Sequence, residues 1–391
     1  MAPIRVLSIF GTRPEAIKMA PVVLALKGCL QIESQVCVTA QHREMLDQVL
    51  NIFGITPDLD LNLMRPDQSL AKLTSAIFSK LDSILEEQNP DWVLVQGDTT
   101  TVMAAALASF YRHIRVGHVE AGLRTNDKWQ PFPEEINRRV ASVVADLHFA
   151  PTEWSRQNLL RENVPDDHIV VTGNPVIDAL QYIADQPETP EVARLLDQIG
   201  ISTQDDHSPK LVLVTAHRRE NFGVPLENIC AALHILAETY ADKIRIVYPV
   251  HLNPNVKGPV YTLLGKVPNI TLLPPLDYLP MVHLLKRARL VLTDSGGLQE
   301  EAPSLGVPVL VMRDVTERPE GVQAGTVDLV GTDINRIVSQ TSRLLDDDIA
   351  HRTMAQAINP YGDGNAAGRI VQALLGASAQ RSDRFIGPAG V

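Results

Sequence analysis

Residues 292–321 read LTDSGGLQEEAPSLGVPVLVMRDVTERPEG, and this stretch predicts a strand, a glycine turn, a helix and a second strand. The helix is predicted for 298–305 and the second strand for 307–312. Unpaired N–H groups and the helix dipole favour an anion at a helix N-terminus, and glycine lets a phosphate approach closely. The turn is therefore predicted to bind phosphate through Ser295, Gly296 and Gly297.

Two charged residues beyond the turn would complete a nucleotide site. Glu301 follows Gly297 by four residues, so it lies one turn further along the same helix face. A carboxylate does not bind phosphate, but it can accept hydrogen bonds from the hydroxyl groups of a ribose. Arg318 follows the second strand and could pair with a diphosphate. The alternative is an ordinary helix cap with surface carboxylates, because short glycine motifs are not specific by themselves.

Composition limits the protein class. The length of 391 residues suggests two domains, and 45% hydrophobic residues suffice for substantial cores. A net charge of −11 argues against general nucleic-acid binding. No apolar run approaches the roughly 20 residues of a membrane span, so we expect no membrane association. Widely spaced Cys29, Cys37 and Cys230 fit reduced cysteines in a cytoplasmic protein and lack metal-ligand spacing.

Apolar strand patterns alternate with helical patterns through most of the chain. Continuous apolar strands in β-α alternation are typical of a parallel sheet that is covered on both faces. The alternation weakens over 186–209, which is rich in Pro, Asp and Thr, and then starts again. We therefore predict two Rossmann-like, doubly wound α/β domains that face a cleft. The predicted ranges are 1–180, 181–376 with a last helix that can pack back on the first domain, and a flexible tail over 377–391.

Polar residues follow several predicted strands, where ligands of doubly wound sheets bind. Arg13 and Lys18 follow the first strand of the first domain, and His217 follows the first strand of the second. Three acids, Asp98, Glu120 and Glu134, lie after strands or at a helix start in the first domain. Neighbouring acids whose pKa values are pushed apart can serve as general acid and base.

Each of these residues also has a structural interpretation. Asp98 could cap a helix, Glu134 could stabilise a helix dipole, Glu120 could form a salt bridge and His217 could be a core histidine. The first strand is not followed by G-x-G-x-x-G, and the chain has no P-loop motif and no metal-ligand spacing. The sequence thus predicts an enzyme without cofactor or metal that acts on a nucleotide-linked substrate by acid–base chemistry.

Ten motifs in order form a recognisable set. They are FGTRPEAIKMAPV (10–22), TAQHREMLDQ (39–48), GDTTT (97–101), GHVEAGLRT (117–125), PEEINR (133–138), TGNPVIDAL (172–180), HRREN (217–221), PVHLNPNV (249–256), TDSGGLQEEAPSLGVPVLVMRDVTERPE (293–320) and NPYGDG (359–364). From about residue 4 to residue 375 the chain closely resembles the bacterial non-hydrolysing UDP-N-acetylglucosamine 2-epimerases.

The resemblance implies a glycosyltransferase-B-type fold, usually in a homodimer, and a reaction without cofactor. These epimerases interconvert UDP-N-acetylglucosamine and UDP-N-acetylmannosamine for cell-surface polysaccharides. They eliminate UDP across C1–C2 to give 2-acetamidoglucal, and UDP adds back after reprotonation of C2 on the other face.

The resemblance also implies residue roles. It assigns catalysis to Asp98, Glu120, Glu134 and His217, with two of the acids moving the C2 proton and His217 assisting the leaving diphosphate. Which acid is the base stays open. It assigns UDP binding to Arg13, Lys18, His217, Ser295, Gly296, Gly297, Glu301 and Arg318. Leu276 and Met281 stand at the uracil positions, where relatives commonly carry Gln and Phe.

Some relatives bind a second UDP-N-acetylglucosamine as an activator. The matching positions are Gln41, Glu44, Arg218, Glu220 and His251. Glu44 replaces a common Gln and Asp67 a common Arg, and two added carboxylates argue against strong activator binding.

Four alternatives remain from the sequence. They are a hydrolysing epimerase that releases UDP and N-acetylmannosamine, a glycosyltransferase of the same fold, an epimerase for a modified UDP-sugar and a non-catalytic UDP-sugar sensor. The three acids favour an epimerase.

Overall fold

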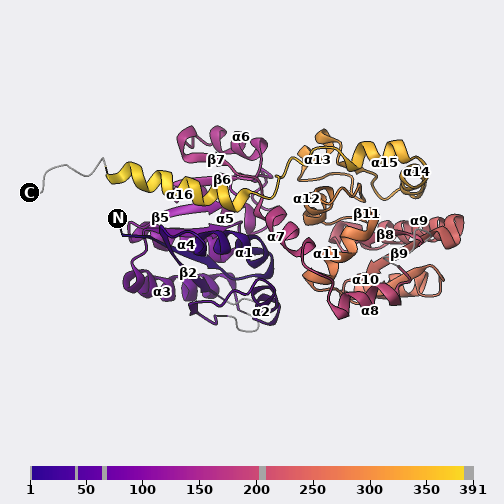
Figure 1. Cartoon of the computed structure of the whole chain (residues 1–391), viewed down its shortest axis with the longest axis horizontal. Coiled ribbons are helices and arrows are strands. Elements are labelled where there is room, and N and C mark those ends of the chain that lie inside the picture. Colours follow the sequence, from indigo (N-terminus) through magenta and orange to yellow (C-terminus); the bar gives the residue numbers. More distant parts are fainter. Residues whose placement is uncertain (1, 40–42, 64–67, 202–207, 383–391) are drawn as a thin grey trace, which may run out of the picture. The chain divides into compact units, whose positions relative to one another are not determined.

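Two separate parallel sheets organise the chain (Figure 1). The computed structural model describes residues 2–39, 43–63, 68–201 and 208–382. The chain divides into two units, of which the first combines Met1–Ala179 with Tyr361–Val391 and the second comprises Leu180–Pro360.

The first sheet has seven parallel strands in the order β3-β2-β1-β4-β5-β6-β7. Its strands are β1 (Ile4–Phe10), β2 (Ile32–Val38), β3 (Leu59–Asp60), β4 (Trp92–Gln96), β5 (Arg115–Val119), β6 (Leu147–Ala150) and β7 (Ile169–Val171). Side chains on both faces of β1 and β4 are buried, so these strands are continuous apolar runs in the sequence. The strand order reverses between β1 and β4, and doubly wound sheets bind their ligands at such a switch point.

Helices cover both faces of the first sheet. They are α1 (Arg13–Lys27), α2 (Arg43–Ile52), α3 (Leu70–Gln88), α4 (Thr100–Tyr111), α5 (Glu134–Val144), α6 (Glu153–Arg161), α7 (Pro175–Ala184) and α16 (Ala366–Ser382), with a 3-10 turn, η1, at Asp166–His168. Helices α3, α4 and α5 share one core cluster with β1 and β4. Helix α16 packs beside α1.

The second sheet has six parallel strands in the order β10-β9-β8-β11-β12-β13, so the strand order reverses between β8 and β11. Its strands are β8 (Lys210–Thr215), β9 (Ile244–Pro249), β10 (Ile270–Leu273), β11 (Ala288–Thr293), β12 (Val309–Val311) and β13 (Val327–Leu329). One face packs on α9, α10 and α14, and the other on α8, α11 and α12. The predicted α/β class with two doubly wound sheets is confirmed.

The helices of the second unit are α8 (Pro190–Gln198), α9 (Val224–Tyr240), α10 (Pro254–Leu264), α11 (Tyr278–Arg287), α12 (Gly296–Ser304), α13 (Pro319–Ala324), α14 (Ile334–Asp346) and α15 (Asp348–Ala355), with 3-10 turns η2 (Arg219–Asn221) and η3 (Ala241–Lys243). Helix α12 begins two residues before its predicted start at 298, because its two glycines already adopt helical conformation. Strands β3 and β13, which were not predicted, have two and three residues.

The last helix belongs to the first unit. Carboxylate oxygens of Asp178 in α7 accept the N–H groups of Ala366 (3.2 Å) and Ala367 (2.8 Å) at the start of α16. Further along, the Trp92 ring donates a hydrogen bond to Ser378 Oγ at 3.0 Å. The second unit therefore ends at Pro360, earlier than the expected 376, and the helix continues to Ser382 into the stretch expected to be a flexible tail. The two units part inside α7, before the weakly patterned stretch at 186–209.

None of the helices in the described ranges combines the length and apolar character that crossing a membrane requires.

Candidate functional site

The turn after β1 is ordered by a buried acid. Glu15 is 2% exposed, and its Oε2 accepts the N–H groups of Gly11 (3.0 Å) and Thr12 (2.7 Å), while Oε1 accepts the Thr99 hydroxyl at 2.7 Å. Thr12 and Glu15 form a capping box that starts α1. Burial raises the pKa of Glu15, and the hydrogen bonds from Thr99, Thr12 and Gly11 oppose that rise. The turn holds Arg13, whose side chain has no hydrogen bond or ion pair with any described residue.

Glu120 is the most firmly held of the three predicted acids. It follows β5 with a φ of +61°, in the left-handed region where a non-glycine residue is uncommon. Lys18 Nζ donates to both carboxylate oxygens, at 2.6 and 2.7 Å, and Asn174 Nδ2 donates to Oε1 at 2.9 Å. Gln96 Nε2 donates to Oε2. A carboxylate with four hydrogen bonds, two from an ammonium group, is stabilised as the anion.

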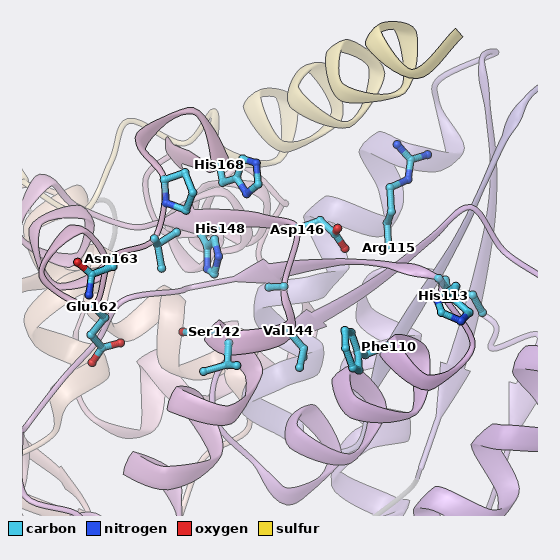
Figure 2. A pocket seen from close by; sticks show the side chains of 15 residues that line it. Phe110, His113, Arg115, Ser142, Val144, Asp146, His148, Glu162, Asn163 and His168 are labelled. Carbon is cyan, nitrogen blue, oxygen red and sulfur yellow. The ribbon is translucent and has the colours of Figure 1, made fainter. Parts of the chain in front are cut away.

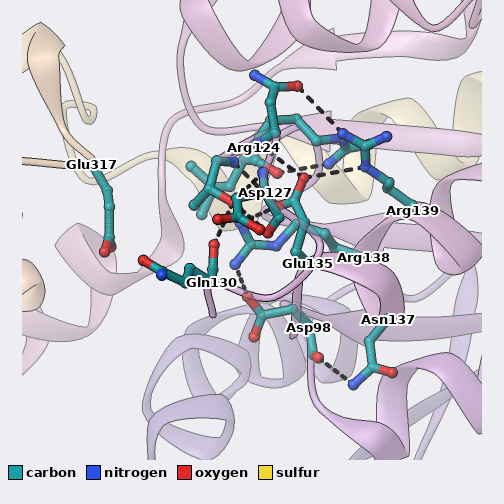
Figure 3. A network of polar contacts seen from close by, with 12 residues as sticks. Asp98, Arg124, Asp127, Gln130, Glu135, Asn137, Arg138, Arg139 and Glu317 are labelled. Carbon is teal, nitrogen blue, oxygen red and sulfur yellow. Dashed lines mark hydrogen bonds and ion pairs between the residues drawn. The ribbon is translucent and has the colours of Figure 1, made fainter. Parts of the chain in front are cut away.

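Asp98 belongs to a second network, shown in Figure 3. The Arg138 guanidinium bridges the carboxylates of Asp98 and Glu135. Glu135 is completely buried and also accepts a hydrogen bond from Arg139 at 3.1 Å. Asn137 Nδ2 donates to the backbone carbonyl of Asp98 at 2.9 Å. The first turns of α5 thus fix the loop after β4 in place, through both its main chain and its side chain.

Glu134 is the first residue of α5. Its side chain is half-buried and makes no hydrogen bond or ion pair with the residues that the structure describes. The helix that Glu134 begins contacts Asp98 one turn later, through Asn137 and Arg138. The predicted acids therefore come from adjacent strands β4 and β5 and from the helix that supports the β4 loop.

In the second unit, His217 follows β8 and Asp294 follows β11, the two neighbouring strands between which the strand order reverses. Asp294 is completely buried, and its Oδ2 accepts the N–H groups of His217 and Arg218, both at 2.8 Å, and Asn221 Nδ2 at 3.0 Å. Its Oδ1 lies 3.5 Å from Nδ1 of His217. The His217 ring stacks on the His251 ring, with centroids 5.3 Å apart and planes 14° apart.

Burial lowers the pKa of His217. Asp294 opposes this effect, whereas His251 and Arg218 lower the pKa further. The side chain of His217 keeps 39% of its surface exposed, so the ring is held on one side and open on the other.

Helix α12 begins at the glycine turn, with Ser295 as its N-cap. Arg318 lies against Gly296 and pairs with the buried carboxylate of Glu300. Gly297 has open space where a side chain would stand. Glu301 is half-buried one turn further on. The predicted phosphate turn and its arginine are thus in contact, and the arginine pairs with the buried Glu300 and with the more exposed Glu317.

The remaining predicted positions are less defined. Leu276 and Met281 are partly buried and pack against the core on the α11 side of the second sheet. Glu220 pairs with the buried Arg313, and the exposed His251 accepts the Asn253 N–H at 3.1 Å. Gln41 and Asp67 lie outside the described residues, as does the side chain of Glu44.

Comparison with known proteins decides the family. Residues 25–375 match the family model described as UDP-N-acetylglucosamine 2-epimerase. The chain is 58% identical to an Escherichia coli O157:H7 UDP-N-acetylglucosamine 2-epimerase over 95% of this chain and 98% of that protein. The chain belongs to the UDP-N-acetylglucosamine 2-epimerase family. Members of this family are isomerases.

Solved structures of the epimerase family share the fold. A Neisseria meningitidis epimerase bound to UDP-GlcNAc matches with a TM-score of 0.86 and 51% identity, covering 95% of this chain and 100% of that one. A Methanocaldococcus jannaschii epimerase in complex with UDP-GlcNAc and UDP matches with a TM-score of 0.77 and 33% identity, covering 95% and 99%. The predicted pair of Rossmann-like domains, of the glycosyltransferase-B type, is confirmed.

Sequence reasoning missed the residues that hold this epimerase's candidate side chains. Gln96 and Asn174 contact Glu120, Arg138 contacts Asp98, and Asp294 contacts His217. Arg138, Asn174 and Asp294 all lie in motifs that mark the family, and this was the available signal. No group of three or more His, Cys, Asp or Glu side chains within the described ranges could hold a metal ion.

A separate hollow of about 650 Å³ opens at the opposite edge of the first sheet, at the amino ends of β5, β6 and β7 (Figure 2). Arg115, Asp146, His148 and His168 line it together with Phe110 at the end of α4. Because the candidate residues of this family member follow the carboxyl ends of the strands, the hollow is not part of the candidate site.

Proposed function

We propose that this enzyme reversibly epimerises UDP-N-acetylglucosamine to UDP-N-acetylmannosamine by the non-hydrolysing route, for cell-surface polysaccharide synthesis. The observation that carries the proposal is the grouping of Asp98, Glu120 and Glu134 at the carboxyl ends of β4 and β5 and the start of α5, in a chain of this family. A sensor that only bound a UDP-sugar would not need three such acids.

The chemistry explains why acids and a nucleotide site are both required. The hydrogen at sugar C2 is not acidic, because no carbonyl group is adjacent to it. A base takes the C2 proton while the C1–O bond breaks, and the electron pair leaves with UDP to give 2-acetamidoglucal. Protonation of C2 on the other face and return of UDP to C1 complete the epimerisation. No redox cofactor is consumed in this sequence.

We assign the proposed roles by how strongly each acid is held. Glu134 has no hydrogen bond or ion pair with the described residues and Asp98 pairs with one guanidinium, whereas Glu120 accepts four hydrogen bonds that lower its basicity. Asp98 and Glu134 are therefore the better candidates for moving the C2 proton. Glu120 would instead stabilise positive charge that develops near C1 as the leaving group departs.

The nucleotide would bind to the second unit. Gly296 and Gly297 would offer N–H groups to the diphosphate at the start of α12, with Arg318 beside them. Glu301 would accept hydrogen bonds from the ribose, and His217 would donate one to the leaving diphosphate. Leu276 and Met281 would present an apolar surface to the uracil. Arg13 and Lys18 would contribute positive charge from the first unit.

A proton NMR time course in D2O tests the proposal. With UDP-N-acetylglucosamine as the substrate, we expect an equilibrium mixture of the two UDP-sugars, deuterium at C2 and no accumulating free sugar. Steady release of UDP and N-acetylmannosamine would identify a hydrolysing enzyme instead. An unchanged spectrum with detectable UDP binding would reject this substrate and favour a modified UDP-sugar, a transferase or a sensor.

We further propose that the enzyme is a cytoplasmic homodimer without strong activation by a second UDP-N-acetylglucosamine. Unpaired Cys29, Cys37 and Cys230 fit a reducing compartment. Phe110 and Val143, at the ends of α4 and α5, expose 54% and 84% of their surface and support self-association. Sedimentation tests the dimer, because Val143→Glu should sediment as a smaller species than the wild type. If strong activation is absent, the rate should depend hyperbolically rather than sigmoidally on substrate concentration.

A further inference from the structure

Asp294 presents two oxygens that have different surroundings. Oδ2 accepts three hydrogen bonds, from the N–H groups of His217 and Arg218 and from Asn221 Nδ2. Asn221 Nδ2 also donates to the Met312 carbonyl at 3.1 Å, which fixes the orientation of that amide. All three groups are donors only, so the atom at the Oδ2 position must be an acceptor.

The other oxygen, Oδ1, is buried and makes no hydrogen bond within the described residues. It faces Nδ1 of His217 at 3.5 Å, slightly beyond ordinary hydrogen-bond length. A carboxylate oxygen repels a nitrogen lone pair and attracts an N–H group at this distance. The stacked ring of His251 restricts rotation of the His217 ring away from this contact.

We propose that Asp294 is a positioning residue that holds the neutral His217 ring in its Nδ1–H form, so that Nε2 is the atom that exchanges a proton or hydrogen bond with the leaving diphosphate. This inference deepens the proposed function and rests on it for the identity of the ligand. In this arrangement the neutral ring accepts at Nε2, and the protonated ring lies between two anions, with Nδ1–H toward Asp294 and Nε2–H toward the diphosphate.

The charges around the ring agree with such a cycle. Burial together with His251 and Arg218 lowers the pKa of His217, so the ring is neutral without ligand near pH 7, and Asp294 is the group that favours the proton. A diphosphate would add a second anion. The ring would then gain its proton when the nucleotide binds and lose it when the nucleotide leaves.

The three donors at Oδ2 make Asp294→Asn a decisive variant. The new amide oxygen must occupy the Oδ2 position to keep those hydrogen bonds, which turns the NH2 group toward His217. Nδ1 then has to accept, and the proton moves to Nε2. The variant thus keeps the fold contacts and inverts the tautomer of the ring.

The test is a long-range proton–nitrogen correlation spectrum of the full-length protein labelled with 15N-histidine. The His217 signals are assigned by their loss in His217→Gln. We expect the Nδ1–H form in the wild type at pH 8 and the Nε2–H form in Asp294→Asn. An Nε2–H wild type, or the same tautomer in both proteins, would overturn the inference. The wild-type spectrum decides even where the variant does not fold.

Kinetics give the second readout. In Asp294→Asn we expect kcat to fall about a hundredfold or more while the Kd for UDP changes less than about tenfold, as for a wrong tautomer in an intact site. An equal loss of UDP affinity would point to a merely structural role and overturn the inference. Absence of epimerisation in the wild type would reject the proposed function alone, because the tautomer is measured without substrate.

Discussion

Gly296 and Arg318 lie so close together that a Cβ atom at Gly296 would stand 2.7 Å from Cζ of Arg318. The guanidinium cannot move aside without disturbing its contact with Glu300, whose side chain is 3% exposed. Arg318 thus lies directly against the N-terminus of α12, and a side chain at position 296 would have to displace its guanidinium.

Gly296→Ala is therefore expected to destabilise the protein by about 1–3 kcal/mol, as overpacking does. UDP binding should weaken as well, because Arg318 is displaced. The matched control is Gly297→Ala, since a Cβ at that position meets no described atom within 4 Å apart from its chain neighbours and the backbone of its own helix. Urea unfolding of both variants checks the prediction, and equal losses of stability would contradict it.

Lys18→Met should reduce epimerisation about a hundredfold, in the range of a lost charged catalytic partner. Without the ammonium group, buried Glu120 loses two charge-assisted hydrogen bonds, which the neutral amides of Gln96 and Asn174 do not replace. Lys27→Met is the control, because Lys27 is exposed in the last turn of the same helix. Steady-state rates of the two variants give the comparison, and similar rates would show that the Lys18–Glu120 pair does not matter for turnover.

Variants of Arg138 and Arg139 can distinguish the effect of orienting Asp98 from the effect of pairing with Glu135. Both arginines contact Glu135, but only Arg138 contacts Asp98. We expect Arg138→Met to lower kcat by about a hundredfold and Arg139→Met to leave kcat within a few-fold of wild type. Thermal melting of both variants accounts for the shared loss at Glu135. If kcat falls equally in both, the Asp98 contact has no catalytic role.

Acid stability should depend on His118. Burial lowers the pKa of this histidine to about 4, although its hydrogen bond to the Gly97 carbonyl opposes the shift. The histidine in the unfolded chain takes up its proton near pH 6.5. Between pH 6.5 and about 4 the unfolded state therefore binds more protons than the folded state, and the free energy of unfolding decreases as the pH is lowered. His148, with a pKa of about 3, acts in the same direction.

Between pH 6.5 and pH 5 the titration of His118 should lower the free energy of unfolding of the wild type by roughly 2 kcal/mol. His118→Gln should not show this part of the decrease. Glutamine keeps a donor for the Gly97 carbonyl. Urea unfolding at several pH values measures the slope, and His234→Gln on the exposed side of α9 serves as the control. Parallel pH profiles for wild type and His118→Gln would refute the prediction.

Periodicity was sufficient for most of the fold. Strands such as β1 and β4 are continuous apolar runs, and runs of that kind in α/β alternation specify a doubly wound sheet. Strands β3 and β13 escaped because two or three residues carry no period, and they exist through pairing with β2 and β12. Capping by Asp178, 188 residues before Ala366, was equally invisible in local sequence.

The candidate side chains were found because they follow strands, where doubly wound sheets bind ligands. The pairings between these side chains and their partners were not found, because pairing depends on tertiary contacts. Asp294 lies 77 residues from His217, and Lys18 lies 102 residues from Glu120. Nothing in the local sequence distinguishes the buried Glu300, which pairs with Arg318, from its neighbour Glu301.

The return of α16 to the first unit has a consequence for synthesis on the ribosome. Residues 180–360 interrupt the first unit, whose helix α16 is translated only after the whole of the second unit. The first sheet has to wait for α16 before Trp92 and Asp178 gain their partners. The second unit can therefore reach its final state while the first is still incomplete, although its sequence begins later. A nascent chain stalled after residue 360 should protect the second sheet from protease sooner than the first.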